Sequence, residues 1–418
     1  MAAYQLNLQN KLPIVINSLM LFYAFLLPLS KAGINIVSAL MIILFLFDKN
    51  IKKYITMLIS NKIIIAILLF LSFSVISLLW TNDISNGLKE LKTYFHFFPI
   101  IIFIIYLKEE QIFSLISAFL LAVFISEIFS YGVFFELWIV GNATPSNPSP
   151  FMHHIQYSML LAFSSLLLLN KLFFETNIKL RILYFIYFIT VTVNLFINGG
   201  RTGQMAFIIS IFILGFLNVK NKILAFISIL LITIIILVTA YNTSPVFYSR
   251  TNLASAELTK LFTNSQDKFD GSLGNRVAIW IESKRLMKEN PIIGTGIGCE
   301  LSSLVDTIDI NSKKYTAIIG INHYHNNYIS YMVQLGLIGL ILYLNIFYQI
   351  YKLSIKNKEL SNIKYIFLSI FSIVSLMDFT FTLQFPIAFF AIYIGIFIVA
   401  HNKENQLNQT FGDYNTHA

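Results

Sequence analysis

The chain has 418 residues, of which 57% are apolar and only 12% are charged. A soluble domain carries about 25% charged residues, so this composition excludes an ordinary water-soluble fold and makes lipid the main solvent. The formal net charge is +9, but the basic residues stand mostly in short loops between apolar stretches, which favours a membrane protein and no nucleic-acid partner. The single cysteine, Cys299, excludes an intrachain disulfide.

Apolar stretches recur along the chain at the length that a membrane-spanning helix needs, about 20 residues. They predict an all-α polytopic membrane protein with about twelve transmembrane helices. The first stretch is interpreted as a retained helix because no small-residue cleavage site follows it. The predicted helices are 13–30, 33–48, 62–80, 93–107, 111–135, 152–169, 181–198, 203–218, 222–240, 326–351, 363–378 and 383–400.

Lysine and arginine counts predict the orientation. Basic residues are concentrated in the loops that follow the even-numbered helices, and such loops face the cytoplasm. Both termini are therefore predicted to be cytoplasmic, and the long loop 241–325 extracytoplasmic. The expected organisation is helices one to nine in residues 1–240, the periplasmic loop in 241–325, helices ten to twelve in 326–400 and a cytoplasmic tail in 401–418.

The long loop is expected to be mostly helical and to carry the chemistry. Amphipathic helices are predicted at 251–263 and 275–289, the second with an apolar face that includes Ile279, Trp280 and Leu286. Pro291 ends that helix, and a glycine-rich turn follows at 294–298. Long ordered loops on a rigid scaffold often hold functional sites.

Three outer arginines could bind an anion. Arg201 stands between two apolar helices, with glycines on both sides that let a large anion approach the backbone. Arg276 begins a loop helix, where free N–H groups also favour anions, and Arg250 follows the ninth helix. A guanidinium presents a donor fork that suits phosphate. The alternative for each is a structural role, as an interfacial anchor or a solvated loop residue.

The densest polar cluster, residues 322–328, opens directly onto the tenth predicted helix. It holds His323 and His325, and a neutral histidine accepts a proton near pH 7. Asn326 or Asn327 could cap the helix. The spacing of the two histidines could also indicate a metal, but no cysteine or carboxylate adjoins them to complete a zinc set.

Two further sets of polar residues lie on the outer side. His153 and His154 follow a Pro/Ser/Asn-rich loop and could line a substrate entrance or simply begin a helix. Asp378, between the last two helices, could hydrogen-bond an acceptor sugar or cap a helix end. The chain has no Walker A, Rossmann or HExxH motif, so ATP, nicotinamide and zincin chemistry are unsupported, and no cofactor is predicted.

In this order and with this topology, the features of the chain resemble the O-antigen ligase family (the WaaL, or Wzy C-terminal, superfamily). The likeness in topology covers most of the chain. The local matches are Gly200-Arg201-Thr202, Ser272-Leu273-Gly274-x-Arg276, Pro291-Ile292-Ile293-Gly294-x-Gly296-x-Gly298, His323-x-His325-Asn326-Asn327-Tyr328 and Gly336-Leu337-Ile338-Gly339.

The resemblance implies a GT-C-like glycosyltransferase of the bacterial inner membrane with its active site facing the periplasm. Such ligases transfer a glycan from undecaprenyl diphosphate to a sugar hydroxyl of lipid A–core by inverting chemistry, without metal or nucleotide. Its expected partners are therefore this lipid-linked donor, the lipid A–core acceptor and membrane lipids.

The family's functional residues fall on named positions of this chain. His325 would be the catalytic base, and Arg201 and Arg276, with Arg250 as a helper, would bind the diphosphate. His323 and Asn326 would orient the base. Asn327 and Asp378 are further candidates, either beside the base or at the acceptor.

Several functions share these features. An O-antigen polymerase uses the same donor, and a protein O-oligosaccharyltransferase transfers the glycan to Ser or Thr. A transporter of the lipid-linked glycan is a different class, but it would place its polar groups near the bilayer midplane, whereas here they gather on the outer side.

Overall fold

The computed structural model describes residues 2–263, 269–299, 318, 319, 321 and 323–416. Within these ranges the regular structure is helical, apart from an isolated bridge between Thr144 and Asn147. The helices are α1 (Ala2–Leu26), α2 (Lys31–Leu46), α3 (Ile51–Ile59), α4 (Lys62–Ile76), η1 (Ser77–Leu79), α5 (Ile84–Thr93), η2 (Tyr94–Phe97), α6 (Pro99–Tyr106), η3 (Glu109–Gln111), α7 (Ile112–Phe134), α8 (His154–Phe174), α9 (Ile178–Ile197), α10 (Arg201–Asn218), α11 (Lys222–Thr243), α12 (Pro245–Phe262), α13 (Gly271–Glu289), α16 (Asn327–Gln334), α17 (Gly336–Lys352), α18 (Lys358–Met377) and α19 (Gln384–Thr416).

The described helices fit a multi-pass membrane protein. Eight of them are long and apolar enough to cross a membrane, or nine if the bent pair α2 and α3 counts as one span, and two shorter apolar helices lie at Lys11–Leu26 and Gly336–Lys352. The prediction of about twelve spans is therefore not confirmed as a count. The stretch Gln384–Asn402 of α19 is mostly buried inside the bundle, whereas α11 is largely exposed and suits a lipid-facing position.

Three predicted spans differ from the structure because the backbone breaks inside or beside them. The chain turns by 111° between α2 and α3. The span expected at 93–107 is divided between η2 and α6, with Pro99 at the first turn of α6. The span expected at 326–351 is two helices, because Gly336 has φ +64°, a left-handed conformation that ends α16.

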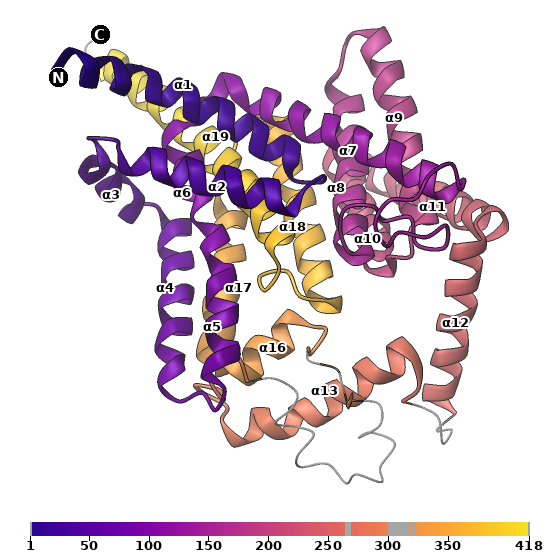
Figure 1. Cartoon of the computed structure of the whole chain (residues 1–418). Coiled ribbons are helices and arrows are strands. Elements are labelled where there is room, and N and C mark those ends of the chain that lie inside the picture. Colours follow the sequence, from indigo (N-terminus) through magenta and orange to yellow (C-terminus); the bar gives the residue numbers. More distant parts are fainter. Residues whose placement is uncertain (1, 264–268, 300–317, 320, 322, 417–418) are drawn as a thin grey trace.

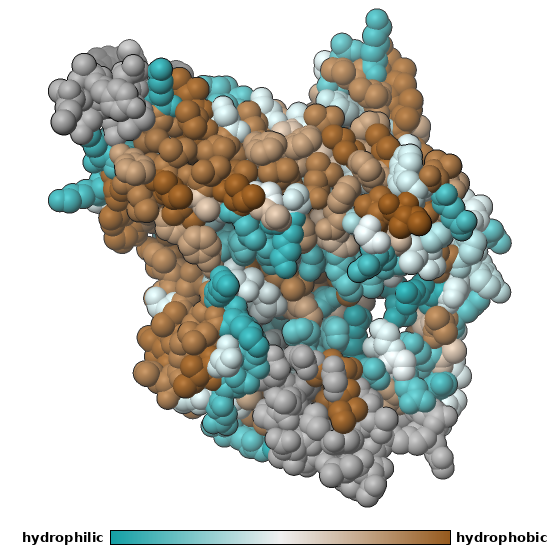
Figure 2. Space-filling view, in the orientation of Figure 1, coloured by the Kyte–Doolittle hydropathy of each residue, from teal (hydrophilic) through white to brown (hydrophobic). Residues whose placement is uncertain are grey.

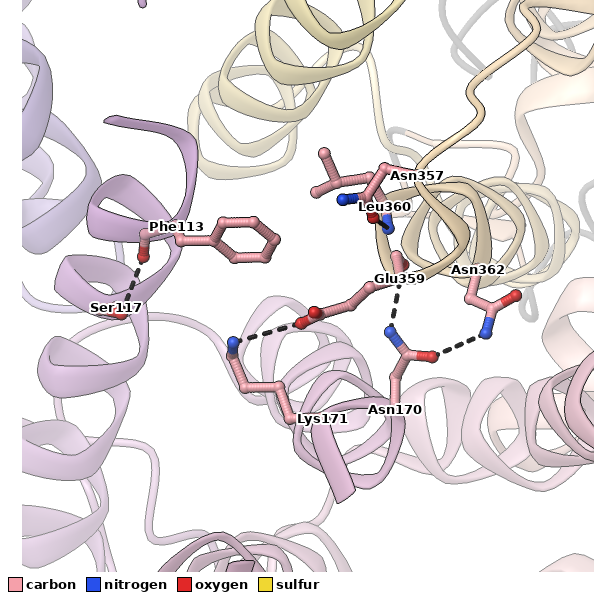
Figure 3. Close-up of polar contacts among 8 residues, drawn as sticks. All are labelled: Phe113, Ser117, Asn170, Lys171, Asn357, Glu359, Leu360 and Asn362. Atoms are coloured by element: carbon pink, nitrogen blue, oxygen red, sulfur yellow. Dashed lines mark hydrogen bonds and ion pairs between the residues drawn. The ribbon is translucent and has the colours of Figure 1, made fainter. Parts of the chain in front are cut away.

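Polar contacts align three helices of the bundle at one end (Figure 3). Lys171 of α8 lies 3.3 Å from the carboxylate of Glu359 at the start of α18. The amide of Asn362 in α18 donates to Asn170 of α8 at 2.9 Å. It also donates to Asn218 at the end of α10, a residue that Figure 3 does not include, at 2.9 Å. Since α8 and α10 end here and α18 begins here, the first residues of α8 and α10 and the last residues of α18 share the opposite end.

The two helices predicted in the long loop are present as α12 and α13. In Figure 1, α12 descends on the right and α13 crosses the lower end of the molecule, below α16. The predicted apolar face of α13 is confirmed: Ile279, Ser283 and Leu286 are buried, and Trp280 packs against the same cluster, to which Val333 of α16 belongs. The α13 helix is thereby fixed against α16.

Two of the glycine-bearing segments singled out in the sequence bind each other. The N–H of Leu337 donates to Pro291 at 2.9 Å, and the N–H of Ile338 donates to Ile292 at 3.2 Å. A Cβ on Gly336 would lie 2.3 Å from the carbonyl oxygen of Ile292, so only glycine permits this approach. We call the segments 291–298 and 333–338, with the part of the chain around Ser77–Gly87 that they touch, the outer clasp, after the side of the membrane predicted for them from the sequence.

The third part of the outer clasp precedes and begins α5. Thr81 donates its hydroxyl to Ile297 at 2.7 Å, and Ser77 accepts from the N–H of Ile297 at 3.1 Å. A Cβ on Gly298 would lie 2.0 Å from the N atom of Gly87. The glycine-rich turn thus joins three distant parts of the chain and holds the C-terminal end of α13 in place.

Candidate functional site

The candidate base lies at the junction between the long loop and α16. His325 precedes the N-cap residue Asn326, whose side chain accepts from the N–H of Ile329 at 3.0 Å. The capping role expected for this pair of asparagines is thus filled by Asn326. Asn327 points elsewhere: its buried amide donates to Thr380 at 2.7 Å and to Tyr343 at 3.4 Å, which ties the start of α16 to the turn between α18 and α19.

The backbone of His325 is itself unusual. Its φ is +48°, and the only other described non-glycine residue with a positive φ is Glu136. A left-handed conformation costs a non-glycine residue roughly 1–2 kcal/mol, and such strain is often found at functional sites. Here the capped helix on one side and the packed turn on the other hold it.

His325 faces a carboxylate that the sequence did not pair with it. Its Nδ1 lies 3.6 Å from Oδ1 of Asp378, which follows the last turn of α18 in extended conformation and is 3% exposed. Nδ1 is buried and makes no hydrogen bond with the described residues. The same Asp378 oxygen accepts from the N–H of Phe379 at 2.9 Å, so the carboxylate is fixed in position.

His323 lies beside the pair. Its ring is 4.4 Å from the ring of Phe379, and that of His325 is 5.7 Å from it. Although part of His323 is exposed, desolvation lowers its pKa, the charge of His325 lowers it further, and Asp378 opposes both. Its surroundings thus disfavour the charged form of His323.

Arg276 of α13 is in the electrostatic field of the same carboxylate. Burial lowers the pKa of Arg276, Asp378 opposes this, and Arg201 adds to the lowering, so both charges act on Arg276. The N-terminus of α13 is held by Glu257 of α12, whose carboxylate accepts from the N–H groups of Ser272 and Leu273 at 3.1 and 3.0 Å. Glu257 also acts electrostatically on Arg276, and sequence reasoning did not single it out.

Arg201 and Arg250 come together at the start of α10. Gly199 stands two residues before Arg201, and a Cβ added to Gly199 would lie 3.6 Å from Nη2 of Arg250. The charges of Arg250, Asp378 and Arg201 all act on the ring of His154, the first residue of α8. The structure therefore places His154 inside the cluster, next to Asn147, whose amide nitrogen lies 3.5 Å from its Nδ1.

The glycines around Arg201 have a packing role beyond the one expected from the sequence. A Cβ on Gly200 would lie 2.3 Å from Oγ of Ser158, and one on Gly203 would lie 2.3 Å from the backbone of Ser158. The N–H of Gly203 donates to this hydroxyl at 3.2 Å. These glycines let α10 approach α8 closely, and so fix Arg201 beside His154.

The arrangement has the electrostatics of an anion site. Arg201, Arg250 and Arg276 are all partly exposed, and none of their guanidinium groups forms a hydrogen bond or an ion pair within the part of the chain described here. Two carboxylates, Asp378 and Glu257, act on Arg276, whereas the region holds three arginines. The local charge is therefore positive, and a multivalent anion would be stabilised. No group of three or more His, Cys, Asp or Glu side chains among the described residues is arranged to hold a metal ion.

Fold and site together define a multi-pass helical membrane protein with a cationic, histidine-bearing site at one end of its bundle. Residues 186–344 match the family model described as O-antigen ligase, which confirms the resemblance found in the sequence over this segment. The segment includes the three arginines and His325 but not Asp378. No curated protein matches the chain.

Figure 2 shows how the polar surface is distributed in one view. Apolar residues cover much of the upper part of the molecule, and hydrophilic residues gather below it, toward the level of α13. This polarity fits a bundle in lipid with its charged site at one boundary.

Proposed function

We propose that this protein is an O-antigen ligase: it transfers a glycan from undecaprenyl diphosphate to a sugar hydroxyl of lipid A–core, on the periplasmic face of the bacterial inner membrane. Support comes from the family match and from one observation above all. The carboxylate of Asp378 lies beside His325 and acts electrostatically on Arg276, His154 and His323, and Arg201 acts on Arg276 and His154 as well.

In the proposed reaction, an acceptor hydroxyl oxygen attacks the anomeric carbon of the donor sugar. The bond from that carbon to the phosphate oxygen breaks, and undecaprenyl diphosphate leaves with both electrons. Arg201 and Arg276, helped by Arg250, bind the diphosphate, whose negative charge grows as the bond breaks. Cations that are already in position at a low-dielectric boundary stabilise such charge strongly.

The proton of the acceptor hydroxyl goes to His325. Because Nδ1 faces Asp378 at 3.6 Å, the ring has Nε2 left to accept that proton. The carboxylate of Asp378 stabilises the imidazolium that forms, as the aspartate does in a catalytic triad. The diphosphate leaving group supplies the driving force, so the proposal needs no nucleotide or metal.

A deletion strain tests this function. We expect lipopolysaccharide to lose its glycan polymer while the polymer accumulates on undecaprenyl diphosphate. A gene carrying His325→Ala should insert normally in the membrane and fail to restore ligation, whereas wild type should restore it.

Other results would contradict the ligase. Loss of long chains alone would indicate a polymerase, and loss of a glycosylated protein would indicate protein O-glycosylation. Normal capping of lipid A–core by the His325→Ala protein would eliminate His325 as the base.

A further inference from the structure

We propose that a second polar pocket, on the α5 side of the His323–Phe379 pair, binds the sugar ring that accepts the glycan. This inference rests on the proposed function. The pocket has a volume of about 190 Å³ and lies between α5, α16 and the turn from Phe379 to Leu383. We call it the α5 pocket.

The α5 pocket adjoins the candidate base. His323 and Phe379 both line it, and the ring of Phe379 lies between 4 and 6 Å from both histidine rings, at 4.4 Å from His323 and 5.7 Å from His325. An occupant of this pocket would therefore contact residues that also contact the proposed base. No arginine lines it, so it is distinct from the place proposed for the diphosphate.

The lining has the chemistry that recognises hydroxyl groups. Lys89 and Glu90 face it from α5 and Gln334 from α16. The Lys89 ammonium donates to Asn86 at 2.8 Å, which leaves two of its three protons for a ligand. The Gln334 amide donates to Glu90 and to Ser330, at 3.3 Å in both cases, so these polar groups are held in place before a ligand binds.

Size and composition select the class of ligand. Pockets for drug-sized molecules measure about 300–1,000 Å³, and this one is smaller. A single pyranose ring, with an apolar face for Phe379 and hydroxyls for the charged and amide groups, suits it. A polypeptide acceptor would need an extended groove with backbone partners, and the pocket offers charged side chains instead.

The same sugar chemistry could come from two sources, lipid A–core or the end of a growing lipid-linked glycan. The outer clasp does not distinguish between these two sources. It only holds the pocket in shape, because the amide oxygen of Gln334 accepts from the N–H of Gly298 at 3.3 Å. The experiment must therefore compare the two sources directly.

Thiol protection tests binding without requiring turnover. In a Cys299→Ser background, Thr93→Cys places a single thiol in the pocket and keeps Lys89, and Lys92→Cys places one on the same helix, exposed and outside the lining. We expect purified lipid A–core to slow maleimide labelling of Thr93→Cys at least about tenfold and to leave Lys92→Cys unchanged. Undecaprenyl diphosphate alone should protect neither.

The outcomes are distinct. Protection by the lipid-linked glycan instead of lipid A–core keeps the sugar site and assigns it to the polymer end. Protection by neither sugar, or only by a Ser/Thr-containing peptide, overturns the inference.

Kinetics supply a second test in the full-length protein. Lys89→Met should raise the KM for the sugar acceptor about tenfold and leave the KM for the lipid-linked donor unchanged, whereas Lys92→Met should change neither. Wild-type activity with an unaltered acceptor KM in Lys89→Met would overturn the pocket and leave the ligase standing. Absence of glycan transfer by wild type would overturn both.

Discussion

At the scale of single residues, the pair His325–Asp378 decides the proposed chemistry. Asp378→Asn keeps the size of the side chain and removes the charge that stabilises an imidazolium. We expect kcat for glycan transfer to fall at least about a hundredfold, with the donor KM little changed. Turnover of purified protein in nanodiscs measures both.

The matched control for this substitution is Asp270→Asn, which removes an exposed carboxylate just before α13. It should leave kcat near wild type. Equal losses in the two variants would mean that activity responds only to the overall charge of this end of the molecule.

The arginines act through their shape as well as their charge. Arg201→Lys keeps a cation beside His154 but loses the planar fork that binds two phosphate oxygens at once. We expect the KM for the undecaprenyl diphosphate donor to rise about tenfold, while acceptor KM stays constant. Arg181→Lys, at the other end of the bundle, is the control, and a similar rise there would argue against a local clamp.

At the scale of elements, the break between α16 and α17 is what brings the outer clasp together. Gly336→Ala puts a methyl group into a left-handed residue and 2.3 Å from the carbonyl oxygen of Ile292. We expect the free energy of unfolding to fall by about 3 kcal/mol, seen as a lower apparent melting temperature in detergent.

Gly141→Ala separates the cost of a left-handed backbone from the cost of the close contact with Ile292. Gly141 also has a positive φ, of +54°, but its Cβ would meet only one atom, at 3.9 Å. That variant should lose only about 1–2 kcal/mol. If both variants lose the same amount, the close contact with Ile292 contributes nothing.

At the scale of the whole molecule, the proposed orientation places α13 outside and α3 inside. In Figure 1 these helices lie at opposite ends of the molecule. With Cys299 replaced by Ser, we expect an impermeant maleimide to label Lys284→Cys in intact spheroplasts. Lys52→Cys should react only after lysis. Both positions are exposed, so the reverse pattern would place the site in the cytosol.

Periodicity and hydropathy predicted most helices, and the apolar face of α13, because those signals are local. These local signals could not show that α16 and α17 are separate helices. The break at Gly336 depends on its packing against the carbonyl of Ile292, which is distant in the sequence. The α2–α3 bend was missed for a similar reason: a turn of 111° leaves little mark on hydropathy.

The site was predictable as a set of residue types and not as a geometry. Arg201, Arg276 and His325 were singled out because cations and imidazoles are rare near apolar helices. The pairing of His325 with Asp378 joins two loops separated by α16, α17 and α18, and no spacing rule relates them. For the same reason, the sequence left His154 open between lining a substrate entrance and beginning a helix.

The outer clasp also constrains when the protein can complete its fold during synthesis. Its three segments come from an early, a middle and a late part of the chain, so translation must pass Ile338 before they can pack together. Until then the ribosome has released the early helices into the bilayer with their outer ends uncovered. A nascent chain that stalls just before Ile338 would already contain all three arginines proposed to bind the diphosphate, and it would still be inactive.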